Sequence, residues 1–360
     1  MIMKAKKYVG LFIFIGIIIS IIYIILAIKP LSYEYQFTPV WKINTANPVI
    51  NKAPTSAKDS KSTMYFHLGQ TLGYFDEDGR ISLYETFPSK VSISDYYYAT
   101  YNSSADNTDF FKSNGEKAGV IESAGFPYFV DDLIYVFLPG GCSFSKCSSS
   151  GRVLWTFEGT FPITAFAAKN QFTAVGLANG SIKVLDNANG STLIDFAPGG
   201  SDYPVILGLD ISDDGQYIAS ISGHNHQRFV LSHREENQQK IIYHKFFEYD
   251  SPFRTVVSFS NDGKRVFYNY HEGLGIYNLE DKSEKTIPLK DKIISVEESD
   301  DFLILLGNNK NNYTVSVIDN TNTLEGSFSF EADSAFIKAR GNDIYLGKDN
   351  SISRMTVSKE

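Results

Sequence analysis

Beyond residue 36, hydrophobic and polar positions alternate in a short and regular pattern. Runs rich in Val, Ile, Tyr, Phe and Thr are separated by clusters of Gly, Asn, Asp and Ser about every eight to twelve residues. Such runs are typical of β-strands bounded by turns, and no stretch shows the period of about 3.6 residues that marks an amphipathic helix. The pattern predicts an all-β domain over residues 37–360, with the least regularity between residues 96 and 109.

Residues 8–28 follow a different pattern, because all 21 are uncharged and ten of them are Ile. A helix of this length is about 31 Å long, which matches the roughly 30 Å hydrocarbon core of a bilayer. A cleaved signal peptide, the alternative, has a shorter apolar region and a small-residue cleavage site, and residues 28–31 offer no such site. A buried core helix would need a soluble domain that surrounds it. The segment therefore predicts one uncleaved transmembrane helix.

The charges beside this helix predict its orientation. Lys4, Lys6 and Lys7 precede it, and positive residues next to a membrane helix stay on the cytoplasmic side. We therefore expect residues 1–7 in the cytoplasm, a tether at residues 29–36, and the β domain on the far side of the cell inner (plasma) membrane. That side is the periplasm in a Gram-negative cell and the exterior in a single-membrane cell, and the sequence leaves the cell type open.

Repeats within the β domain indicate its architecture. The two tryptophans lie in the same frame, PVWKI at 39–43 and VLWTF at 153–157. A strand–turn–strand unit occurs as LDISDDGQYIA at 209–219 and again as VSFSNDGKRVF at 257–267. Asp-Gly between two alternating runs is a strong hairpin signal, because glycine adopts the positive φ of the turn without steric cost.

A second turn leads into an outgoing strand and recurs along the domain. Its mean spacing, with one unmarked copy allowed, is about forty residues, the length of a four-stranded propeller blade. We therefore predict a β-propeller of eight four-stranded blades, and seven blades stay open as the alternative. The turns lie at residues 76–80, 112–116, 149–152, 186–190, 278–282 and 319–322, and the predicted blades are 48–87, 91–122, 126–159, 163–197, 205–247, 254–289, 293–330 and 334–357.

The last predicted blade holds only about three strands, while residues 38–44 remain at the start of the domain. Placing that first strand in the last blade completes the blade. The arrangement closes the ring and removes two exposed strand edges, which are sites of aggregation.

Two sets of motifs resemble known propeller families. GRVLWTF at 151–157, followed by FTAVGLANGSI at 172–182, looks like a repeat of the quinoprotein-dehydrogenase-like superfamily with its PQQ-like repeats. The resemblance implies that a tryptophan such as Trp155 wedges against the neighbouring blade. The two Asp-Gly units are similar instead to WD40-like and TolB-like repeats. Quinone-binding members use adjacent cysteines, a calcium ion and a catalytic Asp; this chain has no adjacent cysteine pair, so the resemblance implies a non-enzymatic branch.

Composition and charge narrow the range of partners. Hydrophobic residues make up 43% of the chain and charged residues 21%, as in a globular protein, and the formal net charge is −8. Residues 1–30 hold four lysines and no acid, so the remainder carries −8 − 4 = −12. A domain this acidic repels phosphate backbones, which excludes nucleic acid as a partner.

The sequence assigns no catalytic, cofactor-binding or metal-binding residue, and we predict neither enzyme activity nor a cofactor. P-loop, G-x-S-x-G, G-x-G-x-x-G and H-E-x-x-H motifs are absent. His224 and His226 could share one face of a strand and hold a metal, but we interpret them as the tip of a hairpin. We interpret DEDG at 76–79, which is similar to a calcium loop, as a tight turn. Whether Cys142 and Cys147 form a disulfide stays open.

The sequence favours an interaction scaffold that binds other envelope proteins. A disc of blades fixed to the inner membrane resembles, as a distant analogue, the eight-bladed lipoproteins of outer-membrane assembly, which carry a lipid instead of a transmembrane helix. The hydrophilic residues 232–245 are either a partner contact or a solvated hairpin. The alternative function is a sensor that binds a small ligand in the central channel, and a hydrolase or lyase is the third. Partner, ligand, pathway and oligomeric state stay open.

Overall fold

The computed structural model describes residues 16–18, 20, 22–23, 35–46, 48, 50, 63–102, 106–236, 238–251, 255–271 and 273–359. Residues 16–18, 20, 22 and 23 are helical, while the rest of the predicted membrane segment 8–28 and the tether up to residue 34 lie outside the described part. Among the described residues, no helix has both the length and the apolar character needed to cross a bilayer. Residues 37–357 form one compact unit.

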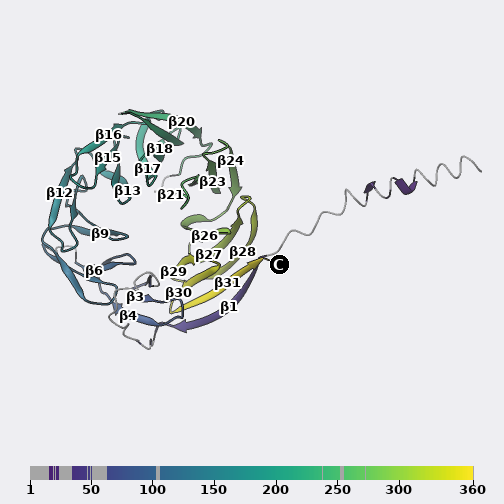
Figure 1. Cartoon of the computed structure of the whole chain (residues 1–360), viewed down its shortest axis with the longest axis horizontal. Helices are drawn as coiled ribbons and strands as arrows, with labels where there is room; N and C mark the ends of the chain where they lie inside the picture. Colours follow the sequence, from purple (N-terminus) through teal and green to yellow (C-terminus); the bar gives the residue numbers. More distant parts are fainter. Residues whose placement is uncertain are drawn as a thin grey trace, which may run out of the picture. The chain divides into compact units, whose positions relative to one another are not determined.

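Within this unit, eight antiparallel sheets follow one another around a ring (Figure 1), which confirms the prediction of eight blades against seven. We number the sheets blades 1 to 8 in chain order. Blade 1 contains β2 (Met64–Leu68), β3 (Thr71–Phe75) and β4 (Ile81–Thr86); blade 2 contains β5 (Lys90–Ile93), β6 (Tyr97–Tyr101), β7 (Thr108–Lys112) and β8 (Lys117–Ile121); blade 3 contains β9 (Phe126–Val130), β10 (Leu133–Phe137), β11 (Ser143–Cys147) and β12 (Val153–Glu158); and blade 4 contains β13 (Ile163–Ala168), β14 (Phe172–Leu177), β15 (Ile182–Asp186) and β16 (Thr192–Phe196).

In the second half of the ring, blades 5, 7 and 8 contain longer strands. Blade 5 contains β17 (Tyr203–Ile211), β18 (Tyr217–His224), β19 (Arg228–Glu235) and β20 (Gln238–Phe246); blade 6 contains β21 (Val257–Phe259), β22 (Arg265–Tyr270), β23 (Gly273–Asn278) and β24 (Glu284–Pro288); blade 7 contains β25 (Lys292–Glu298), β26 (Phe302–Asn309), β27 (Asn312–Asp319) and β28 (Leu324–Glu331); and blade 8 contains β29 (Ala335–Arg340), β30 (Asp343–Lys348), β31 (Ser351–Lys359) and β1 (Tyr35–Asn44).

The first strand of the chain completes the last blade. β1 pairs with β31, so blade 8 has the strand order β1-β31-β30-β29. Just after β1, Thr45 donates its N–H to the carbonyl of Asn350, 2.8 Å away. The predicted closure of the ring by the N-terminal strand is therefore confirmed.

Inner and outer strands differ in sequence pattern because they differ in burial. The second strand of a blade is covered on both faces by its neighbours, and β26 accordingly begins FLILLG with all six residues buried. An outermost strand exposes one face, and β20 alternates between exposed and partly buried residues along its whole length. The core consists of apolar clusters between adjacent blades, such as the one around Phe144, Trp155 and Phe166.

Both tryptophans wedge against the next blade, as the resemblance to quinoprotein-like repeats implies. Trp155 on β12 packs on Gly190 of blade 4 and donates its indole N–H to a main-chain carbonyl of that blade at 3.0 Å. Trp41 on β1 packs on Gly79 of blade 1 and makes the same bond there, also at 3.0 Å. Both glycines have positive φ, which only glycine adopts without strain, so the turns can come close to the indole rings.

Blade 1 has three strands in the described part, where four were expected from residues 48–87. Its β3–β4 turn receives Trp41 as the β15–β16 turn of blade 4 receives Trp155. β2, β3 and β4 therefore correspond to the second, third and fourth strands of the other blades. Residues 51–62, which belong to the predicted blade 48–87, lie outside the described part.

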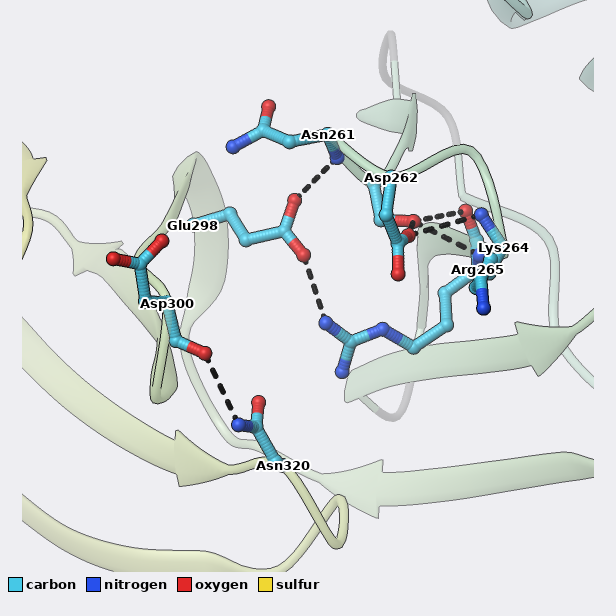
Figure 2. A network of polar contacts seen from close by, with 8 residues as sticks. Asn261, Asp262, Lys264, Arg265, Glu298, Asp300 and Asn320 are labelled. Atoms are coloured by element: carbon cyan, nitrogen blue, oxygen red, sulfur yellow. Dashed lines mark hydrogen bonds and ion pairs between the residues drawn. The ribbon is translucent and has the colours of Figure 1, made fainter.

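Polar contacts join adjacent blades near the ends of their innermost strands (Figure 2). Between blades 6 and 7, the guanidinium of Arg265 contacts one oxygen of the Glu298 carboxylate at 2.7 Å, and the other oxygen accepts the N–H of Asn261 at 2.6 Å. Between blades 5 and 6, the buried carboxylate of Asp210 accepts the N–H of Phe259 at 2.8 Å. Burial raises the pKa of Asp210. These contacts fix one blade relative to the next, and the sequence analysis did not identify them.

Candidate functional site: the upper loop face of the propeller

One face of the ring carries the connections from the outermost strand of each blade to the next blade. The turns between second and third strands lie on the same face, because the residue that follows an outermost strand bonds to such a turn. Gly159 donates its N–H to the carbonyl of Cys142 at 3.0 Å, and Phe247 donates to the carbonyl of Gln227 at 2.9 Å. We call this face the upper loop face and the opposite one, formed by the other turns, the lower loop face.

Exposed aromatic side chains gather on the upper loop face. They lie at the ends of strands or in blade connections, and their exposed fractions run from 41% to 64%. Among the described residues of the ring, the lower loop face exposes one aromatic side chain, Tyr96, beside aliphatic ones such as Leu154 and Leu324. The upper aromatic residues are Phe126, Phe161, Tyr203, Phe246 and Tyr249.

Polar contacts hold the β18–β19 turn rigidly on this face. Asn225 and His226 have positive φ, 55° and 61°, a conformation that Asn and His adopt more readily than most residues. The carboxylate of Asp250 accepts the N–H groups of Asn225 and Gln227 at 2.5 and 3.0 Å, and the hydroxyl of Ser201 lies 2.6 Å from the carbonyl of Asn225. These hydrogen bonds therefore hold the turn in one conformation.

Imidazole and aromatic rings surround this turn. Phe246 has His226 and His244 at ring-centroid distances of 6.4 and 5.5 Å, and Tyr249 has His271 at 5.3 Å. We call these five residues the aromatic patch. The guanidinium of Arg228 lies over the ring of Phe246, 5.3 Å from its centroid. The patch therefore presents flat, partly polar rings on a fixed backbone, which suits contact with another protein.

The structure places the sequence-predicted histidine pair in a turn. His224 is the last residue of β18, and His226 lies in the turn that follows, so the two do not share one face of a strand. Within the described part of the chain, no three His, Cys, Asp or Glu side chains form a group that could hold a metal ion. The interpretation of these histidines as a hairpin tip is confirmed.

The acidic segment at residues 76–79 forms the β3–β4 turn. One carboxylate oxygen of Asp76 accepts the N–H groups of Asp78 and Arg80, at 3.0 and 2.9 Å. The side chain of Arg80 lies 3.2 Å from the carboxylate of Asp78. Asp76 and Asp78 therefore make these contacts within the turn, and the tight-turn interpretation is confirmed.

The two cysteines are free thiols in the structure. Cys147 ends β11 and is buried, and burial raises the pKa of its thiol to about 11. Cys142 lies in the turn before β11, and its sulfur is 3.6 Å from the carbonyl oxygen of Gly140. A thiol with so high a pKa is protonated near neutral pH and therefore a poor nucleophile.

Residues 232–245 belong to the β19–β20 hairpin and pack more closely than a solvated loop would. Ser232 is buried, and the ring of Tyr243 stacks on that of Tyr277 in blade 6 at 4.3 Å. Lys245 contacts the carboxylate of Glu284, also in blade 6, at 3.0 Å. One side of the hairpin therefore joins two blades, and only the other side is open to solvent.

A cavity of about 430 Å³ lies among blades 1, 2 and 3. Its walls come from β2, β5, β6, β9 and β10, of which β6 and β9 are labelled in Figure 1. Several wall residues lie at the strand ends that border the upper loop face. The wall is mostly aromatic, and its rings belong to Tyr65, Tyr101, Phe126, Tyr128, Phe129 and Phe137.

The polar side chains among the described lining residues are uncharged near neutral pH, and two lysines lie beside the aromatic wall. His67 lines the cavity, and burial lowers the pKa of the imidazole, which is therefore uncharged at neutral pH. The ammonium of Lys90 lies 4.7 Å from the centroid of the Phe126 ring, and that of Lys338 lies 4.3 Å from the Tyr65 ring. Among the lining residues that the structure describes, none is Asp or Glu. The sequence analysis expected a ligand only in the central channel and named none of these residues.

Comparisons with known proteins agree with this architecture. A family model described as "beta-propeller protein" matches residues 3–359, and the chain belongs to this family. The ring of eight sheets agrees with that family. An uncharacterized protein of Treponema pallidum (strain Nichols) is 26% identical over 363 residues, which cover 99% of this chain and 96% of that protein.

Three solved structures share the fold. BamB from Moraxella catarrhalis has a TM-score of 0.61 and 13% identity, covering 89% of this chain and all of that one. The C-terminal WD40 domain of Sif2 also has a TM-score of 0.61 and 13% identity, covering 89% and 98%. The computationally designed Ika8 protein has a TM-score of 0.59 and 12% identity, covering 82% and 96%. At these identities the likeness shows the fold alone.

Proposed function

We propose that this protein is a membrane-anchored scaffold that binds another envelope protein through the upper loop face of its propeller. The observation that carries the proposal is the gathering of exposed aromatic side chains on that face beside the rigid β18–β19 turn. The proposal includes no catalytic step, in keeping with the absence of catalytic motifs from the sequence.

The aromatic patch has the properties of a binding surface. Aromatic residues are enriched at protein interfaces, and a few buried anchors supply most of the binding energy. Tyr249 of the patch is 53% exposed, and Tyr203 elsewhere on the upper loop face is 64% exposed, so each has a large area to bury against a partner. Because the carboxylate of Asp250 already fixes the turn, little backbone entropy is lost on binding.

The anchor in this proposal is the apolar segment at residues 8–28. Its length, its lack of charge and the three lysines before it are the support from the sequence. The family match begins at residue 3 and therefore includes the segment. With this orientation, the propeller lies in the periplasm or outside the cell.

Site-specific photocrosslinking in intact cells tests the scaffold. A benzophenone amino acid at Tyr203 or Tyr249 of the full chain should capture a discrete protein partner, and the same amino acid at Tyr96 on the lower loop face serves as the matched control. Adducts that form equally from all three positions, or from none, would contradict the proposal.

Membrane fractionation tests the anchor separately. The full chain should stay with the membrane pellet after carbonate washing, and added protease should reach the propeller only from the non-cytoplasmic side. Recovery of the full-length chain in the wash would exclude the anchor, whatever the crosslinking result.

A further inference from the structure

The cavity among blades 1, 2 and 3 is built like a small-molecule site. Its volume of about 430 Å³ falls in the range of roughly 300–1,000 Å³ that ligand pockets occupy. Phe126 and Tyr128 line it and are 41% and 37% exposed, so aromatic surface is available to a ligand. The ring of Tyr101 lies 6.2 Å from that of Phe126, and Tyr128 meets Phe137 edge to face at 5.6 Å.

The charge around the cavity is unlike that of the whole domain. Residues 31–360 carry a net charge of −12, yet the described residues that line the cavity include no Asp or Glu. Lys90 lies beside the Phe126 ring, and within the described part of the chain no carboxylate forms an ion pair with it. Elsewhere, lysines such as Lys117 and Lys264 pair with acids at 3.0 and 2.7 Å. Lys90 therefore provides an uncompensated positive charge at an aromatic wall.

The second lysine near the cavity is compensated. Lys338 lies over Tyr65, but it also faces the carboxylates of Glu297 and Asp95. Burial alone would lower its pKa, and these groups together raise it above the ordinary lysine value. Lys338 is therefore protonated, and the nearby carboxylates balance its positive charge. This leaves Lys90 as the group that distinguishes ligands by charge.

From these observations we propose that the cavity binds a small anion with a flat apolar body, such as an aromatic carboxylate. The aromatic wall contacts the body, and the ammonium of Lys90 meets the carboxylate. A cationic ligand is disfavoured, because Lys90 and Lys338 already occupy the ring faces of Phe126 and Tyr65 that would attract it. This inference does not depend on a protein partner.

Three ligands that share one ring system test the proposal. They are 2-naphthylacetate, 2-(2-naphthyl)ethanol and 2-(2-naphthyl)ethylamine, titrated calorimetrically into the full chain in lipid nanodiscs, with empty nanodiscs as the blank. We expect the acid to bind about tenfold more tightly than the alcohol, because its carboxylate makes a charge-assisted hydrogen bond with the Lys90 ammonium that the neutral hydroxyl cannot make. The amine should bind most weakly.

Two variants and a control locate the site. Lys90→Gln should reduce the affinity for the acid to that for the alcohol and leave the alcohol unchanged, while Phe126→Ala should weaken all three ligands. Lys264→Gln removes an exposed lysine from blade 6 and should change nothing. Denaturation midpoints confirm that each variant folds. Absence of binding, equal affinity for the three ligands, preference for the amine, or acid binding that survives Lys90→Gln would each overturn the proposal.

Discussion

Two of the junctions between adjacent blades contain a tryptophan that packs on the next blade, and the surroundings of the two indoles differ. Trp155 joins blade 3 to blade 4 inside the chain, and Trp41 joins blade 8 to blade 1 where the ring closes. Each indole donates its N–H to a main-chain carbonyl at 3.0 Å, that of Asn187 or of Glu77. The groups around the two bonds differ.

A buried neutral network surrounds the internal junction. The side-chain oxygen of Asn187 accepts the hydroxyl of Thr173, which shares a hydrogen bond of 2.8 Å with the hydroxyl of Tyr135. The amide of Asn187 also donates to the carbonyl of Lys169 at 2.7 Å. All these polar atoms find partners without exposed charge, so little of the junction depends on solvent.

Charged groups near solvent surround the closing junction. Arg354 donates to the carbonyl of Glu77 at 2.9 Å, and Arg340 lies 3.6 Å from the Glu77 carboxylate. Tyr345 takes the place that Tyr135 has in blade 3, but within the described residues its buried hydroxyl has no hydrogen-bond partner. Exposed ion pairs contribute little to stability, so we infer that the closing junction opens before the internal one.

Removing the indoles gives the largest effect. Trp155 is 9% exposed, and Trp155→Ala should cost about 3–5 kcal/mol of unfolding free energy. Trp41 is partly exposed, so Trp41→Ala should cost less and should speed hydrogen exchange mainly in β1 and β31. Chemical denaturation and hydrogen exchange measure the two effects. An equal or larger loss in Trp41→Ala would contradict the order of the junctions.

Substitution of the glycines under the indoles should follow the same order. A Cβ at Gly190 would lie 2.8 Å from the ring of Trp155, and one at Gly79 would lie 3.1 Å from Trp41. We expect losses of about 2–3 kcal/mol for Gly190→Ala and about 1–2 kcal/mol for Gly79→Ala. Gly263→Ala is the control, because that glycine also has positive φ but no neighbour within 4 Å. Equal losses at all three positions would exclude a role for the indoles.

Removing the hydroxyl of Tyr135 and that of Tyr345 should change the unfolding free energy in different directions, and by less than the tryptophan substitutions. Tyr135→Phe leaves the buried hydroxyl of Thr173 with one partner fewer and should cost about 1–2 kcal/mol of unfolding free energy. Tyr345→Phe removes a buried hydroxyl that has no partner in the described residues, so it should leave stability unchanged or raise it. Urea denaturation at neutral pH distinguishes them. A clear loss in Tyr345→Phe would indicate a partner for that hydroxyl.

The smallest expected effect is a loss of stability at alkaline pH, to which Tyr135 and Tyr345 should both contribute. Burial raises the pKa of Tyr135 to about 12 and that of Tyr345 also to about 12, above the ordinary value of about 10. Between these values the unfolded chain loses protons that the folded chain keeps, so stability falls as pH rises from about 10 to about 12. Each Phe variant should lose its part of this fall. A fall of unchanged size in both variants would contradict burial as its cause.

Most of the architecture could be predicted from the sequence because turn residues mark the blades. The prediction of a blade at 126–159 agrees with β9–β12, which run from Phe126 to Glu158, since glycines such as Gly151 have the positive φ that ends a hairpin. The irregular stretch at 96–109 was harder to interpret. It contains β6 and the start of β7. The tyrosine-rich β6 lacks alternation because both of its faces meet aromatic neighbours, Tyr97 against Phe110 and Tyr98 against Tyr74.

The candidate sites could not be predicted in the same way. The cavity combines Tyr65, Lys90 and Phe126 from three blades, and strand alternation gives no information on which aromatic residue lines a space between sheets. Contacts between blades could not be predicted either. In the sequence Asp210 belongs to a strand–turn unit, and nothing there indicates that its carboxylate accepts the N–H of Phe259 in the next blade. The order of blades follows from local signals, whereas the surfaces they share depend on residues about forty to eighty positions apart.

The membership of β1 in blade 8 has a consequence for synthesis on the ribosome. The 306 residues between Asn44 and Ser351 (351 − 44 − 1) must be made before β1 can meet its partner strand. At roughly 5–20 residues per second this takes roughly 15–60 s, during which the nascent β1 cannot form that pairing. The segment nearest the emerging N-terminus is therefore the last to be locked, and a truncated chain that stops before β31 keeps an open ring and a strand ready to aggregate.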